Sequence, residues 1–179
     1  MNLEQLKHAI RAACDVAKDD ELIIFGSQAI LGSYPNADPD LTQSIEVDAC
    51  PKNKPENVDM IDGALGEMSS FHKTHGYYVH GVSIDSAKLP EGWKKRTVRV
   101  TDYMDKSKMG YCLEIHDLAV SKIIAFRQKD REFVKILILK SMVKADLLLS
   151  RLEKTSTEKE LIEQAVRWVE NVKSEIEEK

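Results

Sequence analysis

The stretch that decides the fold is Leu22-Ile-Ile-Phe-Gly-Ser27, followed after a loop by Ser44-Ile-Glu-Val-Asp-Ala49. The apolar run over residues 22–25 predicts a buried strand. Gly26 lets the backbone turn and come close to a ligand, because it has no Cβ. From Ser27 onward the sequence predicts the first turn of a helix, whose free N–H groups and positive dipole end favour an anion. The pattern therefore predicts a strand, a tight turn and a helix start that faces a phosphate.

The second strand, predicted over residues 44–49, carries two carboxylates. Glu46 and Asp48 point to the same face because side chains alternate along a strand, and their Cα atoms lie about 7 Å apart. At that spacing both carboxylates can share one Mg²⁺ ion, or one of a pair of ions, with phosphate oxygens. Each half of the pattern also has an ordinary interpretation, as a plain strand-to-helix turn and as a solvated strand face. Their order on adjacent predicted strands favours the functional interpretation.

The rest of the chain predicts both helices and strands. Apolar spacing predicts helices over residues 3–18, 60–74, 117–127 and from 157 onward, with a strongly apolar helical stretch over 131–151. Alternation predicts two further strands, over residues 77–84 and 98–100. We therefore expect an α/β (α+β) fold: a mixed sheet flanked by helices over residues 1–113, followed by a C-terminal helical bundle over residues 114–179.

Composition narrows the function classes. The chain has 179 residues, of which 42% are hydrophobic, so it can bury a substantial core. A net charge of −4 argues against a protein that coats nucleic acid, although a local site can still bind a nucleotide or a tRNA end. Cys14, Cys50 and Cys112 lack metal-type spacing and read as buried thiols in a reducing compartment. No signal-peptide core or membrane-length apolar run is evident, so we expect a cytoplasmic protein without membrane contact.

Four blocks of sequence carry a resemblance to a known family: Phe25-Gly-Ser-Gln-Ala-Ile-Leu-Gly32, Ser44-Ile-Glu-Val-Asp-Ala49, Leu89-Pro-Glu-Gly-Trp-Lys-Lys-Arg96, and His116-Asp-Leu-Ala-Val-Ser-Lys122 continuing to Asp130. In this order they resemble the polymerase-β-like nucleotidyltransferase superfamily, and within it small bacterial proteins of the DUF6036 type. The group also resembles AbiEii-type toxin nucleotidyltransferases.

The resemblance implies the transfer of a nucleoside monophosphate from an NTP to a hydroxyl acceptor, with Mg²⁺ or Mn²⁺ as cofactor. Glu46 and Asp48 would be the catalytic, metal-binding acids, while Gly26, Ser27 and Ser44 would bind the nucleotide. The acceptor is open among RNA (including tRNA), protein and a small molecule. A toxin–antitoxin role is implied as well, but Thr42 stands where many toxin relatives place an arginine.

Two further sets of residues extend this implied site. Lys122, Lys129 and Asp130 match a helical segment that faces the nucleotide in the toxin-like relatives; without the resemblance they read equally well as an exposed, charged helix end. The superfamily normally adds a third carboxylate from a neighbouring strand. Here the candidates are His80, by alternation, and Asp85, the nearest acid, and an imidazole suits Mg²⁺ less well than a carboxylate.

A catalytically silent nucleotidyltransferase-fold binding module, acting as a toxin–antitoxin partner, is the alternative function. A missing third carboxylate favours it. The apolar stripes of the last two predicted helices could serve a homodimer, although packing on the sheet domain is the simpler use.

Overall fold

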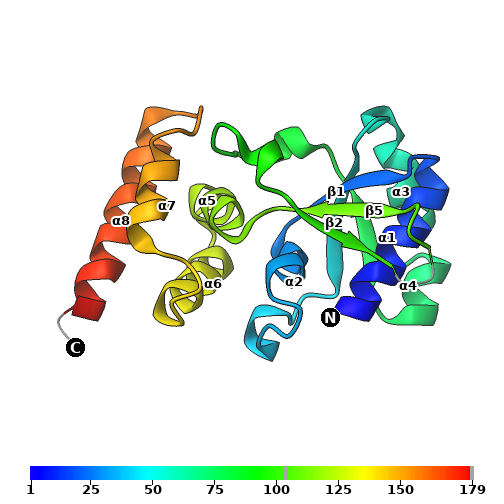
Figure 1. Ribbon diagram of the computed structural model, residues 1–179, viewed down its shortest axis with the longest axis horizontal. Helices are drawn as coiled ribbons and strands as arrows, with labels where there is room; N and C mark the ends of the chain where they lie inside the picture. The colour runs from blue at the N-terminus through cyan, green and yellow to red at the C-terminus, as the bar shows by residue number, and fades with distance from the viewer. Residues whose placement is uncertain (103–104, 178–179) are drawn as a thin grey trace. The chain divides into compact units, whose positions relative to one another are not determined.

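The computed structural model describes residues 1–102 and 105–177 (Figure 1). The chain forms two compact units. The first comprises Met1–Ser86 and Arg96–Glu114, and the second comprises Ala87–Lys95 and Ile115–Lys179. Residues 103, 104, 178 and 179, which fall within the predicted segments 1–113 and 114–179, lie outside the described residues. The predicted domain boundary after residue 113 stays a prediction.

A mixed sheet forms the centre of the first unit. Within the described residues it has five strands in the order β3-β2-β1-β5-β4. β1 runs antiparallel to β2 and parallel to β5, β2 runs parallel to β3, and β4 runs antiparallel to β5. The strands are β1 (Glu21–Phe25), β2 (Glu46–Pro51), β3 (Tyr78–Gly81), β4 (Val98–Thr101) and β5 (Met109–Cys112). The mixed sheet confirms the predicted fold class, but β5 was not predicted and β3 is shorter than expected.

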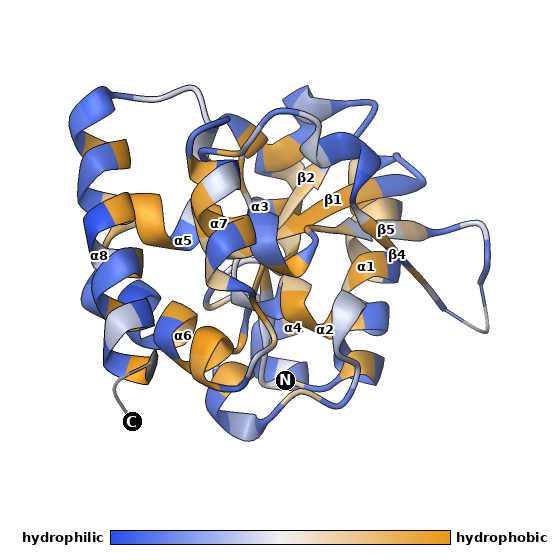
Figure 2. Cartoon of the chain, turned by 60° about the vertical axis from the view of Figure 1, so that its left-hand side comes forward, coloured by the Kyte–Doolittle hydropathy of each residue, from blue (hydrophilic) through white to orange (hydrophobic). Residues whose placement is uncertain are grey.

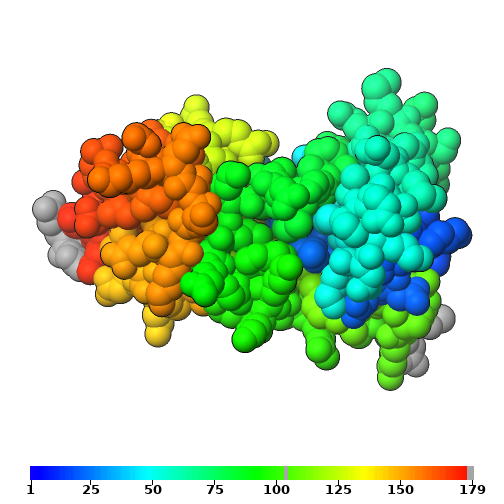
Figure 3. All heavy atoms as spheres, turned by 90° about the horizontal axis from the view of Figure 1, so that it is seen from above, coloured from blue at the N-terminus to red at the C-terminus, as the bar shows by residue number. Residues whose placement is uncertain are grey.

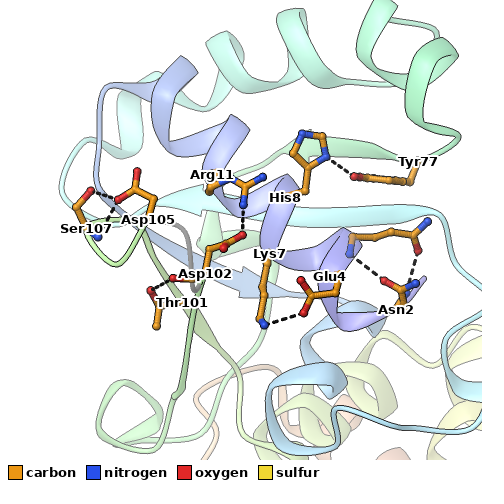
Figure 4. A network of polar contacts seen from close by, with 11 residues as sticks. Asn2, Glu4, Lys7, His8, Arg11, Tyr77, Thr101, Asp102, Asp105 and Ser107 are labelled. Carbon is orange, nitrogen blue, oxygen red and sulfur yellow. Dashed lines mark hydrogen bonds and ion pairs between the residues drawn. The ribbon is translucent and has the colours of Figure 1, made fainter.

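Helices pack on the sheet of the first unit: α1 (Leu3–Ala17), α2 (Ile30–Ser33), α3 (Val58–Leu65) and α4 (Ser70–His75). α1 begins with a capping box in which Asn2 and Gln5 exchange side-chain and backbone hydrogen bonds (Figure 4). Its apolar side packs on β5, where the side chain of Ile10 lies directly over Gly110. A Cβ at Gly110 would lie only 2.5 Å from Ile10 Cδ1, so a larger residue would not fit there. α3 packs beside α1 and β3; Figure 3 shows this cyan segment against the blue N-terminal part.

One predicted helix of the first unit is wrong in its extent. In place of a single helix over residues 60–74, the chain forms α3 and α4 with a break between them. The N–H of Gly66 donates to Asp62 O at the end of α3, and Met68 has a positive φ of 65°. Ser69 then caps α4 by accepting a hydrogen bond from the N–H of His72. The apolar spacing continued through a backbone break that periodicity alone does not detect.

The second unit is helical, as predicted, with α5 (Ile115–Ala125), α6 (Gln128–Leu139), α7 (Ala145–Leu152) and α8 (Lys159–Glu177). Figure 2 shows α8 with polar and apolar residues on different sides, and Ala165, Val169 and Val172 are buried. The apolar stretch over residues 131–151 is divided by a turn at 140–144, where Ser141 has a φ of 55°. Among the described helices, none has the length and apolar character that crossing a membrane requires.

Candidate metal and phosphate site

The two acids of β2 meet a histidine of β3 on one face of the sheet. The parallel pairing of the two strands sets Asp48 opposite His80 and Glu46 opposite Tyr78. His80 Nδ1 lies 3.2 Å from Asp48 Oδ1 and 3.3 Å from Glu46 Oε1. In the described part of the chain, this is the group of three His, Cys, Asp or Glu residues whose ligating atoms all lie within 4.8 Å of one another.

The side chains of the cluster are partly exposed to solvent. The side chains of Asp48, Glu46 and His80 are 25%, 34% and 42% exposed, so an ion can reach all three. Their neighbours Val47 and Ala49, on the opposite face of β2, are buried. The predicted alternation of β2 therefore holds, and the acids lie on the accessible face.

Gly26 lies directly against the carboxylate of Asp48. A Cβ at this position would stand 1.9 Å from Asp48 Oδ2 and 2.9 Å from its Cγ. The backbone of Gly26 has φ 70° and ψ −173°, a conformation that is open essentially to glycine alone. The structure thus brings together the glycine bend after β1 and the acids of β2. The turn needs glycine both for its conformation and for the close approach.

The helix start after Gly26 is a short 3₁₀ turn, Ser27–Ala29, which leads into α2. Ser27 begins that turn, next to Gly26 and partly exposed. Ser44 lies just before β2, where its hydroxyl accepts a hydrogen bond from the N–H of Glu46 at 3.1 Å. Ser44 therefore orders the strand that carries the acids. The nucleotide-binding roles of Ser27 and Ser44 stay predictions.

Gln28 is a buried residue of this region that the sequence analysis did not identify. It is 0% exposed, and its Nε2 donates to Ser44 O at 2.7 Å, which ties the turn after β1 to the start of β2. Its Oε1 has no hydrogen-bond partner among the residues that the structure describes. The signal that could have identified Gln28 is its place directly after the Gly-Ser pair, in a segment that is otherwise apolar.

Tyr78 is a second neighbour that was missed. It stands opposite Glu46, two residues before His80, and so shares their face of the sheet. Burial raises the pKa of its phenol, and the nearby carboxylates of Glu46 and Glu67 raise it further. The ring of His72 lies against it, with 4.9 Å between the ring centroids. The same alternation that singled out His80 also points to Tyr78.

Of the two candidates for the third metal-binding group, the structure brings His80 to the acids and leaves Asp85 apart. Asp85 is exposed in the short 3₁₀ turn Ile84–Ser86, beyond the end of β3, where it accepts a hydrogen bond from Ser83 Oγ at 3.3 Å. Asp85 is not a member of the cluster formed within the described residues.

The comparison with known families agrees with this geometry. A model of the family described as nucleotidyltransferase of unknown function (DUF6036) matches residues 1–178. The chain belongs to this family. No curated protein and no solved structure matches the chain. The resemblance to DUF6036-type nucleotidyltransferases is thus confirmed, while the relation to AbiEii-type toxins stays a prediction.

The remaining predicted residues of this DUF6036 protein lie in its second unit. Asp130 is fully buried, and its carboxylate pairs with Lys122 Nζ at 3.3 Å and with Arg127 Nε at 2.6 Å. Lys122 also lies over the ring of Phe133, 5.5 Å from its centroid. These contacts make Asp130 an anchor for the turn between α5 and α6.

The resemblance matched Lys122, Lys129 and Asp130 to one helical segment, but the structure divides that segment into two helices. α5 ends at Ala125, Phe126 has a φ of 55°, and α6 begins at Gln128, so the two lysines belong to different helices. Lys129 is exposed near the start of α6. The roles of Lys122, Lys129 and Asp130 in nucleotide binding stay predictions.

The residues of the first unit fit a divalent cation. Two carboxylates and an imidazole supply three donors, and carboxylate oxygens suit Mg²⁺ and Mn²⁺. Gly26 supplies a surface without a Cβ beside one of the acids, where backbone can approach a bound group closely. Such a site can hold an ion and a phosphate next to each other.

Proposed function

We propose that this protein transfers a nucleoside monophosphate from an NTP to a hydroxyl acceptor at the site formed by Gly26, Glu46 and Asp48. The close approach of the Asp48 carboxylate to the glycine bend carries the proposal. It sets a cation-binding group beside backbone that a triphosphate can approach. Membership of a nucleotidyltransferase family supports the same reaction class.

In the proposed reaction the acceptor oxygen attacks the α-phosphorus of the NTP and forms a new P–O bond. The bond from the α-phosphorus to the oxygen that bridges to the β-phosphate breaks, and pyrophosphate leaves with the electron pair. The acceptor hydroxyl releases its proton to solvent water. Glu46 and Asp48 would hold a divalent ion, Mg²⁺ or Mn²⁺, which would supply positive charge to the phosphate oxygens and favour loss of that proton.

The chain itself contributes position and charge. Glu46 and Asp48 hold the ion, and the backbone at Gly26 and Ser27 binds the β- and γ-phosphates through its N–H groups. Gln28 and Ser44 keep the turn and β2 in place through the hydrogen bonds described above. Lys122, which pairs with Asp130, and Lys129 are separately proposed as nucleotide-binding residues of the second unit.

The test is a labelling assay. The protein is incubated with NTPs labelled at the α-phosphate, a divalent ion, and three separate acceptor pools: total RNA, protein and small metabolites. Glu46→Gln and Asp48→Asn should abolish labelling in whichever pool is active. Asp85→Asn, which removes an exposed acid outside the cluster, should leave it intact. Equal labelling by the parent and by Glu46→Gln would reject the assigned roles.

A second candidate function is a catalytically silent binding module, which includes the toxin–antitoxin partner and homodimer roles. The observation in its favour is the imidazole of His80 in the place of a third carboxylate. Calorimetric titration with metal–NTP separates the two functions. A transferase binds the metal–nucleotide complex and loses that binding in Asp48→Asn, whereas a silent scaffold gives no heat that depends on Asp48.

A further inference from the structure

We propose that His80 makes the cluster of Glu46, Asp48 and His80 selective for a first-row transition ion over Mg²⁺. This inference rests on the metal site of the proposed function but not on the transfer reaction. Its basis is the identity and placement of the third donor. His80 presents Nδ1, at 3.2 Å and 3.3 Å, to an oxygen of each acid.

The placement of this imidazole is set by the backbone. β2 and β3 pair in parallel, with Val47 opposite Val79 and Asp48 opposite His80. Val79 is fully buried on the other face, so the strand cannot shift by one residue without exposing it and turning His80 away. A Cβ on Gly81 would lie 2.0 Å from Val58 O, so β3 packs tightly against the start of α3 at this point. The imidazole is therefore held at the acids by the fold.

The chemistry of the donors then decides between ions. Mg²⁺ prefers an octahedral shell of oxygens and gives up its water reluctantly. Imidazole nitrogen favours transition ions, whose affinity for such sites rises from Mn²⁺ through Co²⁺. A neutral imidazole also leaves the cluster with two negative charges, one fewer than three carboxylates would supply, which weakens the attraction for a hard ion. Asp85 does not offset this loss, because it lies outside the cluster.

Manganese is the sharpest probe of the imidazole. Mn²⁺ has the same charge as Mg²⁺ and shares its preference for carboxylate oxygen, so the part of their difference in affinity that His80→Ala removes is the contribution of His80. In calorimetric titration without nucleotide, we expect the affinity of the parent protein to rise from Mg²⁺ to Mn²⁺ to Co²⁺. The gap between Mg²⁺ and Mn²⁺ should be at least about tenfold, since even partners outside the ligand shell change metal affinity by roughly 10–100-fold.

Three variants test the inference. His80→Ala should weaken Mn²⁺ binding at least about tenfold, by the same scale. His80→Asp, which supplies a third carboxylate, should reduce the difference in affinity between Mn²⁺ and Mg²⁺. His75→Ala is the matched control: it removes an exposed imidazole of the same unit, outside the cluster, and should leave both affinities unchanged. Circular dichroism confirms that each variant is folded.

A spectroscopic readout separates ligation from a structural role. Pulsed electron paramagnetic resonance of the Mn²⁺-loaded parent should show coupling to an imidazole ¹⁴N. That coupling should vanish in His80→Asp and persist in His75→Ala. Manganese bound without nitrogen coupling, equal affinity of the parent for Mn²⁺ and Mg²⁺, or no metal binding at all would each overturn the inference. Labelling that depends on Glu46 and is supported equally by both ions would overturn the selectivity while upholding the proposed transfer reaction.

Discussion

Replacement of Gly26 by alanine tests the contact on which the candidate site depends. Two costs add at this position. The first is conformational: φ 70° with ψ −173° is a region essentially restricted to glycine, and forcing another residue into it costs about 1–3 kcal/mol. The second is steric, because the new Cβ would stand 1.9 Å from Asp48 Oδ2. Overpacking in a closed core costs about 1–3 kcal/mol, but this carboxylate is 25% exposed and can turn partly away, so we take about 1 kcal/mol. We therefore expect Gly26→Ala to lower the free energy of unfolding by about 2–4 kcal/mol.

A double-mutant cycle separates the two costs. Asp48→Ala removes Oδ2 and Cγ, and the nearest remaining atom of residue 48 is its Cβ at 3.3 Å. Gly26→Ala should therefore cost about 1 kcal/mol less in the Asp48→Ala background than in the parent. Urea unfolding at neutral pH, followed by circular dichroism, measures all four proteins.

Gly76→Ala is the control for the conformational cost alone. Gly76 has φ 75°, and of the atoms that the structure describes none lies within 4 Å of a Cβ built there. It should cost about 1–2 kcal/mol, whether or not Asp48 is present. If the effects of Gly26→Ala and Asp48→Ala add to within about 0.5 kcal/mol, the Asp48 carboxylate does not lie against the glycine bend, and the reasoning about the site is refuted.

Other contacts predict further measurable effects. Asp117 is fully buried and pairs with Arg151 at 2.9 Å, so Arg151→Met should cost about 3–5 kcal/mol in urea unfolding. The hydrogen bond from Tyr111 is the main cause that lowers the pKa of Glu21 to about 2, so this carboxylate stabilises the fold above pH 4.5. That stability should be lost as the pH falls from 4.5 towards 2, and Glu21→Gln should flatten the dependence. Burial lowers the pKa of His8 (Figure 4) below the 6.5 of the unfolded state. Just below pH 6.5, His8 is therefore protonated more often in the unfolded state than in the folded state. The melting temperature should therefore fall below that pH, and His8→Gln should remove the fall.

Elements that depend on short stretches of consecutive residues could be predicted from the sequence. β1, the glycine turn and the acids of β2 follow from an apolar run and from alternation, both of which are properties of consecutive residues. α5 and α8 follow in the same way from apolar spacing, whereas the turn over residues 140–144 that separates α6 from α7 was not predicted. In these segments the local preference and the tertiary structure agree, so short patterns were sufficient.

Elements that depend on partners far away in the sequence could not be predicted from the sequence. β5 (Met109–Cys112) contains a glycine and is only four residues long, so it carries little strand signal. It forms because β1 and β4 pair with it on either side. The break between α3 and α4 likewise depends on backbone geometry at Gly66 and Met68, through which the apolar spacing passes unchanged.

The third member of the metal cluster shows why the site itself was only partly predictable. The sequence left His80 and Asp85 as alternatives, because the choice depends on which residue of β3 stands opposite Asp48. That pairing joins residues 32 positions apart and is set by the burial of Val79 and by the tight packing of Gly81 on the start of α3. A shift of one residue would set Val79 or Gly81 opposite Asp48, and neither side chain can bind a metal. The chemistry of the cluster is thus decided by strand register, which makes the packing of β3 on α3 as important to metal choice as the acids themselves.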